Sequence, residues 1–417
     1  MKRKPLLIAL LLGITAGAMV FNACKKDSGP KDLTLSTLVA GDIDLNGVTS
    51  PSDVPVDPAI IATFSTNIDP ATANATTIIL TQDYDSSPVE LLYIVSGNQI
   101  TIRPVTQLGN GTLYEMNMTA GLKSTDGKAL TALTRTFTTY GTFSPKGLFA
   151  YWTFEDNAND MVGNLNPSAN GVVAITYADS RNAKAGKAAK FNGFSSIIEI
   201  PNADVLVNTT DFTISFWVKT NSTAIDHGHF VMGLGAYYGL QFEVQGSYAE
   251  AKFAIQYEKE DGTTVAEDMA FGADALDNTN GGWQGHDFAK SINATDMASL
   301  LKDNWLHVTY TFEGATKRGI LYYNAEKMKS LDFNLWPDGD PKKTIKAMKY
   351  GGIEPDVKNE LAFGFIQSRG GTMWDAEPWG GYDLPGANHF KGMLDDVKVF
   401  QKVLTPIEID LMYQSEK

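Results

Sequence analysis

The sequence predicts an all-β protein made of two sandwich domains. Apolar residues alternate with a period of two in many short segments, the pattern of a strand with one face on a core. Clusters of turn-forming residues, such as NIDPATAN and LGNG, separate these segments. We therefore expect a small Greek-key sandwich followed by a larger sandwich of two antiparallel sheets.

Residues 1–24 are typical of an export signal. The positively charged stretch KRK comes first, and an apolar run from Pro5 to Val20 follows it. This run is shorter than the about 20 residues that a membrane-spanning helix needs. The segment ends in FNAC, whose cysteine, Cys24, is the only one in the chain, and this ending resembles a bacterial lipobox.

The lipobox resemblance implies that the Cys24 thiol carries a lipid that anchors the protein in a membrane. A plain signal peptide with an incidental cysteine is the alternative. Residues 25–37, which begin KKDSGPKD, are polar and predict a flexible tether. In Bacteroidetes-type lipoproteins an acidic signal behind the cysteine directs the protein to the cell surface, and KKD matches it in part. We expect an outer-membrane lipoprotein at the cell surface, with a periplasm-facing one as the alternative.

Cysteine content and charge limit both the fold and its partners. With one cysteine no disulfide framework is possible, so stability must come from apolar burial. The formal net charge of −14 repels nucleic acid and anionic polymers. We expect neutral ligands and no nucleic-acid partner.

Residues 38–140 predict the small sandwich. Turn clusters separate six alternating runs, which are Ile60 to Phe64, Thr77 to Leu80, Leu91 to Val95, Gln99 to Arg103, Leu113 to Thr119 and Thr134 to Thr138. Six or seven strands in about 100 residues are typical of a Greek-key sandwich. The phrases VPVDPAIIATFSTNIDPAT, LYEMNMTAGLKSTDGKAL and RTFTT resemble a bacterial Ig-like domain, which implies a spacer without chemistry of its own.

Residues 141–147, GTFSPKG, predict the linker between the domains, and residues 148–417 predict the larger sandwich. The segments GLFAYWTFEDN, AGKAAKFNGFSSIIEIP, DFTISFWVKT, NWLHVTYTF and FKGMLDDVKVF follow in this order. They resemble the laminin-G-like branch of the concanavalin A-like lectin/glucanase superfamily, which implies a jelly-roll sandwich. The resemblance implies no single function, because this fold hosts lectins, carbohydrate-binding modules, adhesion modules and glycosidases.

A short capped helix is expected after the last strand. Thr405, Pro406 and Glu408 occupy the positions of a capping box with a proline in the first turn. We expect the helix to turn its apolar residues towards the sandwich, namely Ile407, Leu411 and Met412.

The tryptophans divide into two groups. Trp152, Trp217 and Trp305 lie in alternating segments and are expected in the core, whereas the others lie in loop sequences. An aromatic ring on a loop can lie against the C–H face of a sugar while polar neighbours bind its hydroxyls. The alternative is that these rings only anchor their loops. The predicted ligand-binding residues are Trp283, Trp336, Arg369, Trp374, Asp375, Trp379 and Tyr382.

Metal binding is a further expectation. The laminin-G-like resemblance implies one structural calcium, and Asp160 and Asp395 match its ligand positions, although DMVG replaces the usual Asp-x-Ser-Gly loop. DIDLNG followed by Asp53 is similar to an EF-hand calcium loop, but prolines replace the helix that should follow, which favours a turn. DHGH, residues 226–229, favours a polar loop over a zinc site.

No catalytic residue is assigned from the sequence. A glycosidase needs two carboxylates that flank the scissile bond. The nearest pattern is Glu354, Asp356 and Glu360, but Pro355 argues against a central strand there. The prediction is non-catalytic binding of a neutral glycan or polysaccharide by loop aromatics, in polysaccharide capture. The alternatives are an adhesion or structural module that binds surface proteins, and a glycoside hydrolase or lyase.

Overall fold

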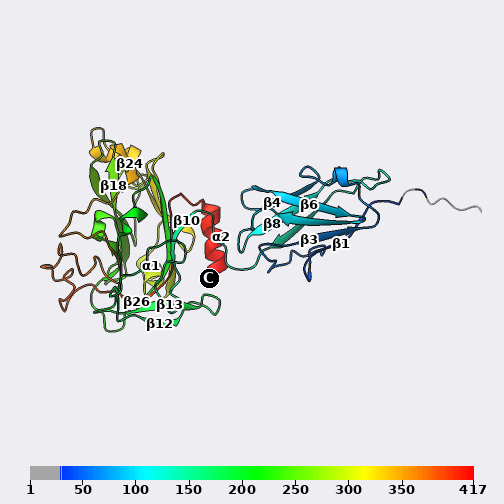
Figure 1. Ribbon diagram of the computed structural model, residues 1–417. Helices are drawn as coiled ribbons and strands as arrows, with labels where there is room; N and C mark the ends of the chain where they lie inside the picture. Colours follow the sequence, from blue (N-terminus) through cyan, green and yellow to red (C-terminus); the bar gives the residue numbers. More distant parts are fainter. Residues whose placement is uncertain (1–28, 30) are drawn as a thin grey trace, which may run out of the picture.

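The computed structural model describes residues 29 and 31–417, which fold into two β-sandwich domains (Figure 1). The predicted export signal, with Cys24, lies outside the described residues. Figure 1 shows helix α2 (Pro406–Glu416) on the side of the large domain that faces the small domain. No helix within residues 29 and 31–417 has the length and apolar character that a membrane crossing requires.

The small domain stacks a five-stranded sheet on a four-stranded sheet. The first sheet consists, from edge to edge, of β2 (Ile43–Asp44), β1 (Leu35–Ala40), β3 (Ile60–Phe64), β7 (Gln99–Pro104) and β6 (Leu91–Ser96). The second consists of β5 (Pro88–Val89), β4 (Ile78–Gln82), β8 (Leu113–Met118) and β9 (Leu133–Thr138). Alternate residues are buried between the sheets, as Ile60, Ala62 and Phe64 are in β3.

The large domain stacks a nine-stranded sheet on an eight-stranded sheet. The nine-stranded sheet consists of β12 (Thr176–Asp179), β13 (Lys187–Asn192), β26 (Lys391–Phe400), β15 (Asp211–Thr220), β21 (Trp305–Glu313), β22 (Arg318–Tyr323), β23 (Glu326–Asp332) and β20 (Phe288–Ala289), with β10 (Leu148–Trp152) paired to β26. The eight-stranded sheet consists of β11 (Val172–Val173), β14 (Ile197–Ile200), β25 (Leu361–Phe363), β16 (His229–Leu234), β17 (Leu240–Val244), β18 (Glu250–Lys259) and β19 (Thr264–Gly272), with β24 (Ile345–Met348) paired to β18.

Short helices connect some of these strands. They are α1 (Ala294–Leu301) and the 3-10 turns η1 (Pro70–Thr72), η2 (Ala203–Leu206), η3 (Ala236–Tyr238), η4 (Phe333–Leu335) and η5 (Pro341–Thr344). The nearly all-β, antiparallel architecture confirms the predicted fold class.

Aromatic rings fill the core between the two large sheets. Phe216 in β15 lies with its ring centroid 5.1 Å from that of Phe242 in β17, and Phe242 lies 4.7 Å from Phe253 in β18. Trp152 is buried in the same core, as expected. Trp217 is buried too, but on the outer face of its sheet beneath α2, where its ring stacks on Tyr413.

Helix α2 has the predicted capping box, formed by Thr405 and Glu408. Ile409 and Met412 are buried, whereas Ile407 is 54% exposed, so the prediction for Ile407 is wrong. At 3.6 residues per turn, Ile407 lies about 200° around the helix axis from Ile409. The capping pattern identifies where a helix begins but does not determine which side faces the sheet.

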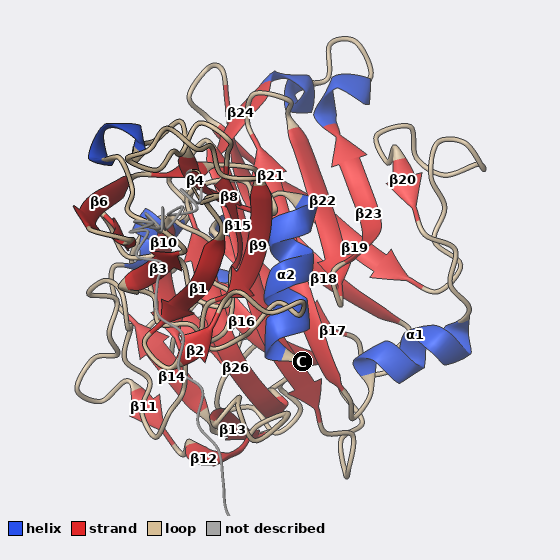
Figure 2. Ribbon diagram, turned by 90° about the vertical axis from the view of Figure 1, so that its right-hand side faces the viewer, coloured by secondary structure: helices blue, strands red, loops and turns tan. Residues whose placement is uncertain are grey.

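A buried ion pair joins α2 to the nine-stranded sheet, and Figure 2 shows the helix in front of the strands of the large domain. The side chains of Lys398 in β26 and Glu416 in α2 are 3% and 2% exposed, and their charged ends are in contact. Glu416 also accepts a hydrogen bond of 2.7 Å from the Trp217 indole. These contacts hold α2 on the sheet and cover Trp217.

The linker is anchored to α2 through Phe143, which is 2% exposed and clusters with Ile409 and Met412. The Phe143 backbone N–H donates to the Ser415 hydroxyl at 2.9 Å. Tyr84 of the small domain lies edge-on against Phe143, with 5.4 Å between the ring centroids. The two domains therefore meet around one linker side chain.

Glu416→Ala would leave the Lys398 ammonium buried without its counter-charge. We expect the free energy of unfolding of the large domain to fall by about 3–5 kcal/mol. Denaturant unfolding followed by tryptophan fluorescence measures this, because all seven tryptophans lie between Trp152 and Trp379. Glu326→Ala, the control, removes an exposed partner of Lys290 and should cost less than about 1 kcal/mol. Equal losses in the two variants would contradict the role given to the buried pair.

Candidate ligand-binding pocket

A pocket of ≈ 610 Å³ lies on the outer face of the eight-stranded sheet. Three adjacent strands supply its floor, which consists of Gln241 and Glu243 in β17, Lys252 and Ala254 in β18, and Ala266 and Asp268 in β19. These residues alternate with the core residues Phe242, Phe253 and Met269. Because successive side chains of a strand point to opposite faces, the same strands form both the core and the floor.

The wall of the pocket comes from the long loop between β25 and β26, which contains neither helix nor strand. Trp374 and Trp379 of this loop are half-buried, and their ring centroids lie 4.9 Å apart at an angle of 48°. Tyr237 of η3 lies 6.4 Å from Trp374, and Phe230 of β16 lies 6.0 Å from Trp379. Aromatic packing thus holds the loop against the sheet and leaves part of each tryptophan exposed.

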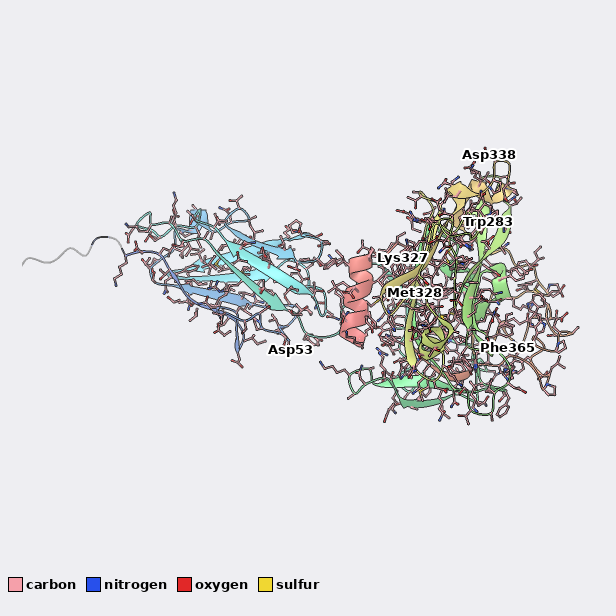
Figure 3. All side chains as sticks on the ribbon, turned by 180° about the vertical axis from the view of Figure 1, so that it is seen from behind. Asp53, Trp283, Lys327, Met328, Asp338 and Phe365 are labelled. Carbon is pink, nitrogen blue, oxygen red and sulfur yellow. The ribbon has the colours of Figure 1, made fainter. Side chains whose placement is uncertain are left out.

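The loop lies on the side of the large domain away from α2. Figure 3 shows this through Phe365, which belongs to the same apolar cluster as Trp374 and Trp379. The pocket therefore faces away from the small domain, and a ligand can approach it without obstruction from that domain.

Charged residues on the floor form one connected group. The Lys252 Nζ atom lies 3.2 Å from Glu243 Oε1 and 3.2 Å from Asp268 Oδ2, so these oxygens are at most twice that distance apart. Partial burial by itself lowers the pKa of Lys252, but the two carboxylates outweigh it and raise this pKa above its usual value. Lys252 therefore stays charged, and the floor carries one negative charge in excess.

Two polar atoms at the pocket have unmet hydrogen-bonding capacity. Within the described residues, neither Gln241 Oε1 nor Trp374 Nε1 has a hydrogen-bond partner, and both atoms are buried. An unpaired buried polar group costs about 1–3 kcal/mol. Both residues line the pocket. Rotation of the Gln241 amide would present an acceptor to a ligand, and rotation of the Trp374 indole would present a donor.

The two floor carboxylates do not resemble an acid and base pair. Hydrolysis of a glycoside needs one carboxyl group that is protonated while the other is ionised. Here the Nζ atom of Lys252 lies 3.2 Å from an oxygen of Glu243 and 3.2 Å from an oxygen of Asp268, so the ammonium occupies the space between the two carboxylates. The arrangement favours hydrogen bonding to a ligand over cleavage of it.

The carboxylates singled out in the sequence lie elsewhere. Glu354 is in a turn between strands and pairs with Lys358 at 3.1 Å. Sequence reasoning missed Gln241, Glu243 and Asp268, although Gln241 and Glu243 are polar residues at outward positions of LQFEV, and AEDMAFG has Asp268 at an outward position. That alternation was the available signal, but it does not show which strands lie side by side.

Three predicted ligand-binding residues lie beside a neighbouring pocket of ≈ 590 Å³, which is lined by Arg369, Asp375 and Tyr382 among others. Arg369 forms an ion pair of 2.6 Å with Glu199, and the Tyr382 hydroxyl donates to the Ser195 carbonyl at 2.6 Å. Arg369 and Tyr382 thus connect the loop to the sheet. Arg369 and Asp375 are exposed, whereas Tyr382 is half-buried.

The remaining two predicted residues lie away from both pockets. Trp336 is 4% exposed and packs against Phe333, with 4.7 Å between ring centroids. Its ring is covered by the protein, which favours the alternative that this ring anchors its loop. Trp283 is 45% exposed and lies edge-on to Trp336 at 6.0 Å, and Figure 3 shows it well apart from Phe365.

Asp160 anchors its own loop. Its carboxylate accepts hydrogen bonds from four backbone N–H groups, those of Tyr151, Val162, Gly163 and Leu165, at 3.0 to 3.2 Å. These bonds use the carboxylate oxygens to hold the loop against β10.

Asp395 forms an ion pair with the side chain of Arg181. The Arg181 guanidinium, whose side chain is 5% exposed, lies 2.6 Å from Asp395 and also contacts Asp396. Burial and the neighbouring Asp396 carboxylate raise the pKa of Asp395 to about 8. Asp160 and Asp395 share no partner, so their contacts do not fit one calcium ion held by both. The described residues contain no group of three or more His, Cys, Asp or Glu placed to bind a metal, and calcium binding stays a prediction.

Comparison with known families assigns both domains. Residues 45–139 match the bacterial Ig-like domain, and residues 192–347 match the concanavalin A-like lectin/glucanases superfamily. The chain joins a bacterial Ig-like domain to a concanavalin A-like domain. The pocket floor lies within the matched part of the concanavalin A-like domain, whereas Trp374 and Trp379 follow it in the chain.

Solved structures resemble the chain only distantly. The binding domain of botulinum neurotoxin serotype D is 12% identical, with a TM-score of 0.39 over 64% of this chain and 50% of that one. The binding domain of Paraclostridial Mosquitocidal Protein 1 is 17% identical, with a TM-score of 0.39 over 64% and 52%. The chain thus spans about half the length of these structures, and similarity at this level says nothing about the pocket. No curated protein matches the chain.

Proposed function

We propose that the protein binds carbohydrate, without cleaving it, at the pocket on the outer face of the eight-stranded sheet. The observation that carries this proposal is the pair of part-exposed rings, Trp374 and Trp379, above a polar floor. Flat rings suit the C–H faces of sugars, while carboxylate and amide groups suit their hydroxyls. The concanavalin A-like fold is compatible with this role but does not by itself establish it.

A protein partner is less well supported by the same pocket. Surfaces that bind proteins are commonly marked by a contiguous exposed apolar patch. Here the apolar rings form one wall, and the floor contains Glu243, Lys252 and Asp268. A concave site with a charged floor favours a small polar ligand over a flat protein surface.

Trp374→Ala and Trp379→Ala each remove a ring from the wall. We expect each variant to bind its glycan at least about tenfold more weakly, a loss of roughly 1.4 kcal/mol. A glycan array identifies ligands of the unaltered protein, and isothermal titration then compares the variants. Trp283→Ala, which removes an exposed ring away from the pocket, is the control and should bind normally. Undiminished binding by both wall variants would place the site elsewhere.

We further propose that the protein is an outer-membrane lipoprotein at the cell surface, where it captures polysaccharide. The sequence of residues 1–24 supports this proposal, although those residues lie outside the described part of the chain. In this arrangement the Ig-like domain holds the concanavalin A-like domain away from the membrane, with the pocket facing outwards.

Cys24→Ala removes the proposed lipid attachment site. In cells given radioactive palmitate we expect label in the unaltered protein, none in the variant, and loss of the variant from the membrane fraction. Protease treatment of intact cells then shows on which side of the outer membrane the protein lies. A protein at the cell surface is cleaved, whereas a periplasm-facing one is protected. An unlabelled natural protein would overturn the lipoprotein proposal.

A further inference from the structure

We infer that the floor of the pocket selects its ligand by charge, accepting uncharged sugars and rejecting sugars that carry carboxylate or sulfate groups. This inference rests on the proposed carbohydrate binding and defines its substrate class. It concerns three floor residues, Glu243, Lys252 and Asp268, which we call the floor triad.

Lys252 is the only cationic residue among the described residues that line the pocket. Its ammonium is shared between two carboxylates, each at 3.2 Å. An anionic sugar that approached Lys252 would therefore also approach Glu243 and Asp268. The triad has one positive and two negative charges, so an anionic group meets net repulsion there.

The triad is partly exposed, so a ligand can contact it. It is also partly buried, so salt screens its charges less than those of a fully exposed group. The side chains of Glu243, Lys252 and Asp268 are 20%, 26% and 51% exposed. The net charge of −14 of the whole chain has the same sign as the floor and adds to the repulsion.

The hydrogen-bonding groups of the floor also favour hydroxyls. Glu243 and Asp268 can only accept, and Gln241 already gives one amide N–H to Glu243 at 3.0 Å while its Oε1 has no partner. A ligand must therefore bring donors, and a sugar hydroxyl supplies one whereas a carboxylate or sulfate does not. Trp374 Nε1 needs an acceptor, which the oxygen of a hydroxyl or of a carboxylate supplies, so this atom does not distinguish the two classes of sugar.

The test uses matched pairs of ligands. Hexose oligosaccharides of several linkages are compared with their C6-carboxylated counterparts of the same length and linkage. We expect the unaltered protein to bind at least one neutral oligosaccharide and to bind its carboxylated counterpart at least tenfold more weakly. Raising the salt concentration should narrow this difference, because the repulsion is electrostatic.

Substitutions of the triad then assign the preference to these residues. Glu243→Gln with Asp268→Asn keeps the side-chain shapes and changes the triad from one net negative to one net positive charge. We expect the difference between the paired ligands to vanish or reverse. Glu258→Gln is the matched control, because it removes a carboxylate from β18 outside the pocket, where Glu258 pairs with Lys349 at 2.8 Å. This variant should keep the preference.

The outcomes separate the inference from the proposed function. Equal binding of paired ligands by the unaltered protein, or an unchanged preference in the double variant, would overturn charge selection and leave carbohydrate binding intact. Absence of binding to every neutral and carboxylated ligand would overturn both. If the double variant does not fold, the single variant Asp268→Asn tests charge selection instead. The Asp268 side chain is 51% exposed, so this substitution should not disturb folding. We expect it to reduce the preference for the neutral ligand severalfold.

Discussion

The structure depends on the period-two alternation of side chains along β17, β18 and β19. Inward residues such as Phe242 and Phe253 fill the core between the sheets, and outward residues such as Glu243 and Lys252 form the pocket floor. A shift of one residue in the pairing of these strands would exchange the two sets and destroy both core and site. The burial that stabilises the domain therefore also fixes the positions of the charged floor residues.

The pocket combines this rigid floor with a wall that belongs to a loop. Trp374 and Trp379 are held by contacts with Phe230 and Tyr237, so the loop is packed on the sheet although it has no regular structure. At the opposite side of the domain, α2 covers the other sheet and contacts the linker. Each sheet thus has one outer face with a distinct role, one for the pocket and one for the junction with the Ig-like domain.

The sequence predicted what short-range patterns encode. Alternation predicted the strands, the capping box predicted α2, and loop composition predicted that Trp374 and Trp379 lie outside the core. It did not predict contacts between distant segments. Glu243 and Asp268 lie near each other only because β17, β18 and β19 pair side by side. Arg181 and Asp395 are far apart in the sequence but form an ion pair. Trp336 lies in a loop, but its ring is buried, and local composition does not show what covers a ring.

The most direct test of the account is a crystal structure of the protein with a bound neutral hexose oligosaccharide. The account predicts a sugar ring against Trp374 or Trp379, with hydroxyl groups within hydrogen-bond distance of Gln241, Glu243 or Asp268. A sugar bound instead beside Trp283, in the pocket lined by Arg369, or on the Ig-like domain would contradict it.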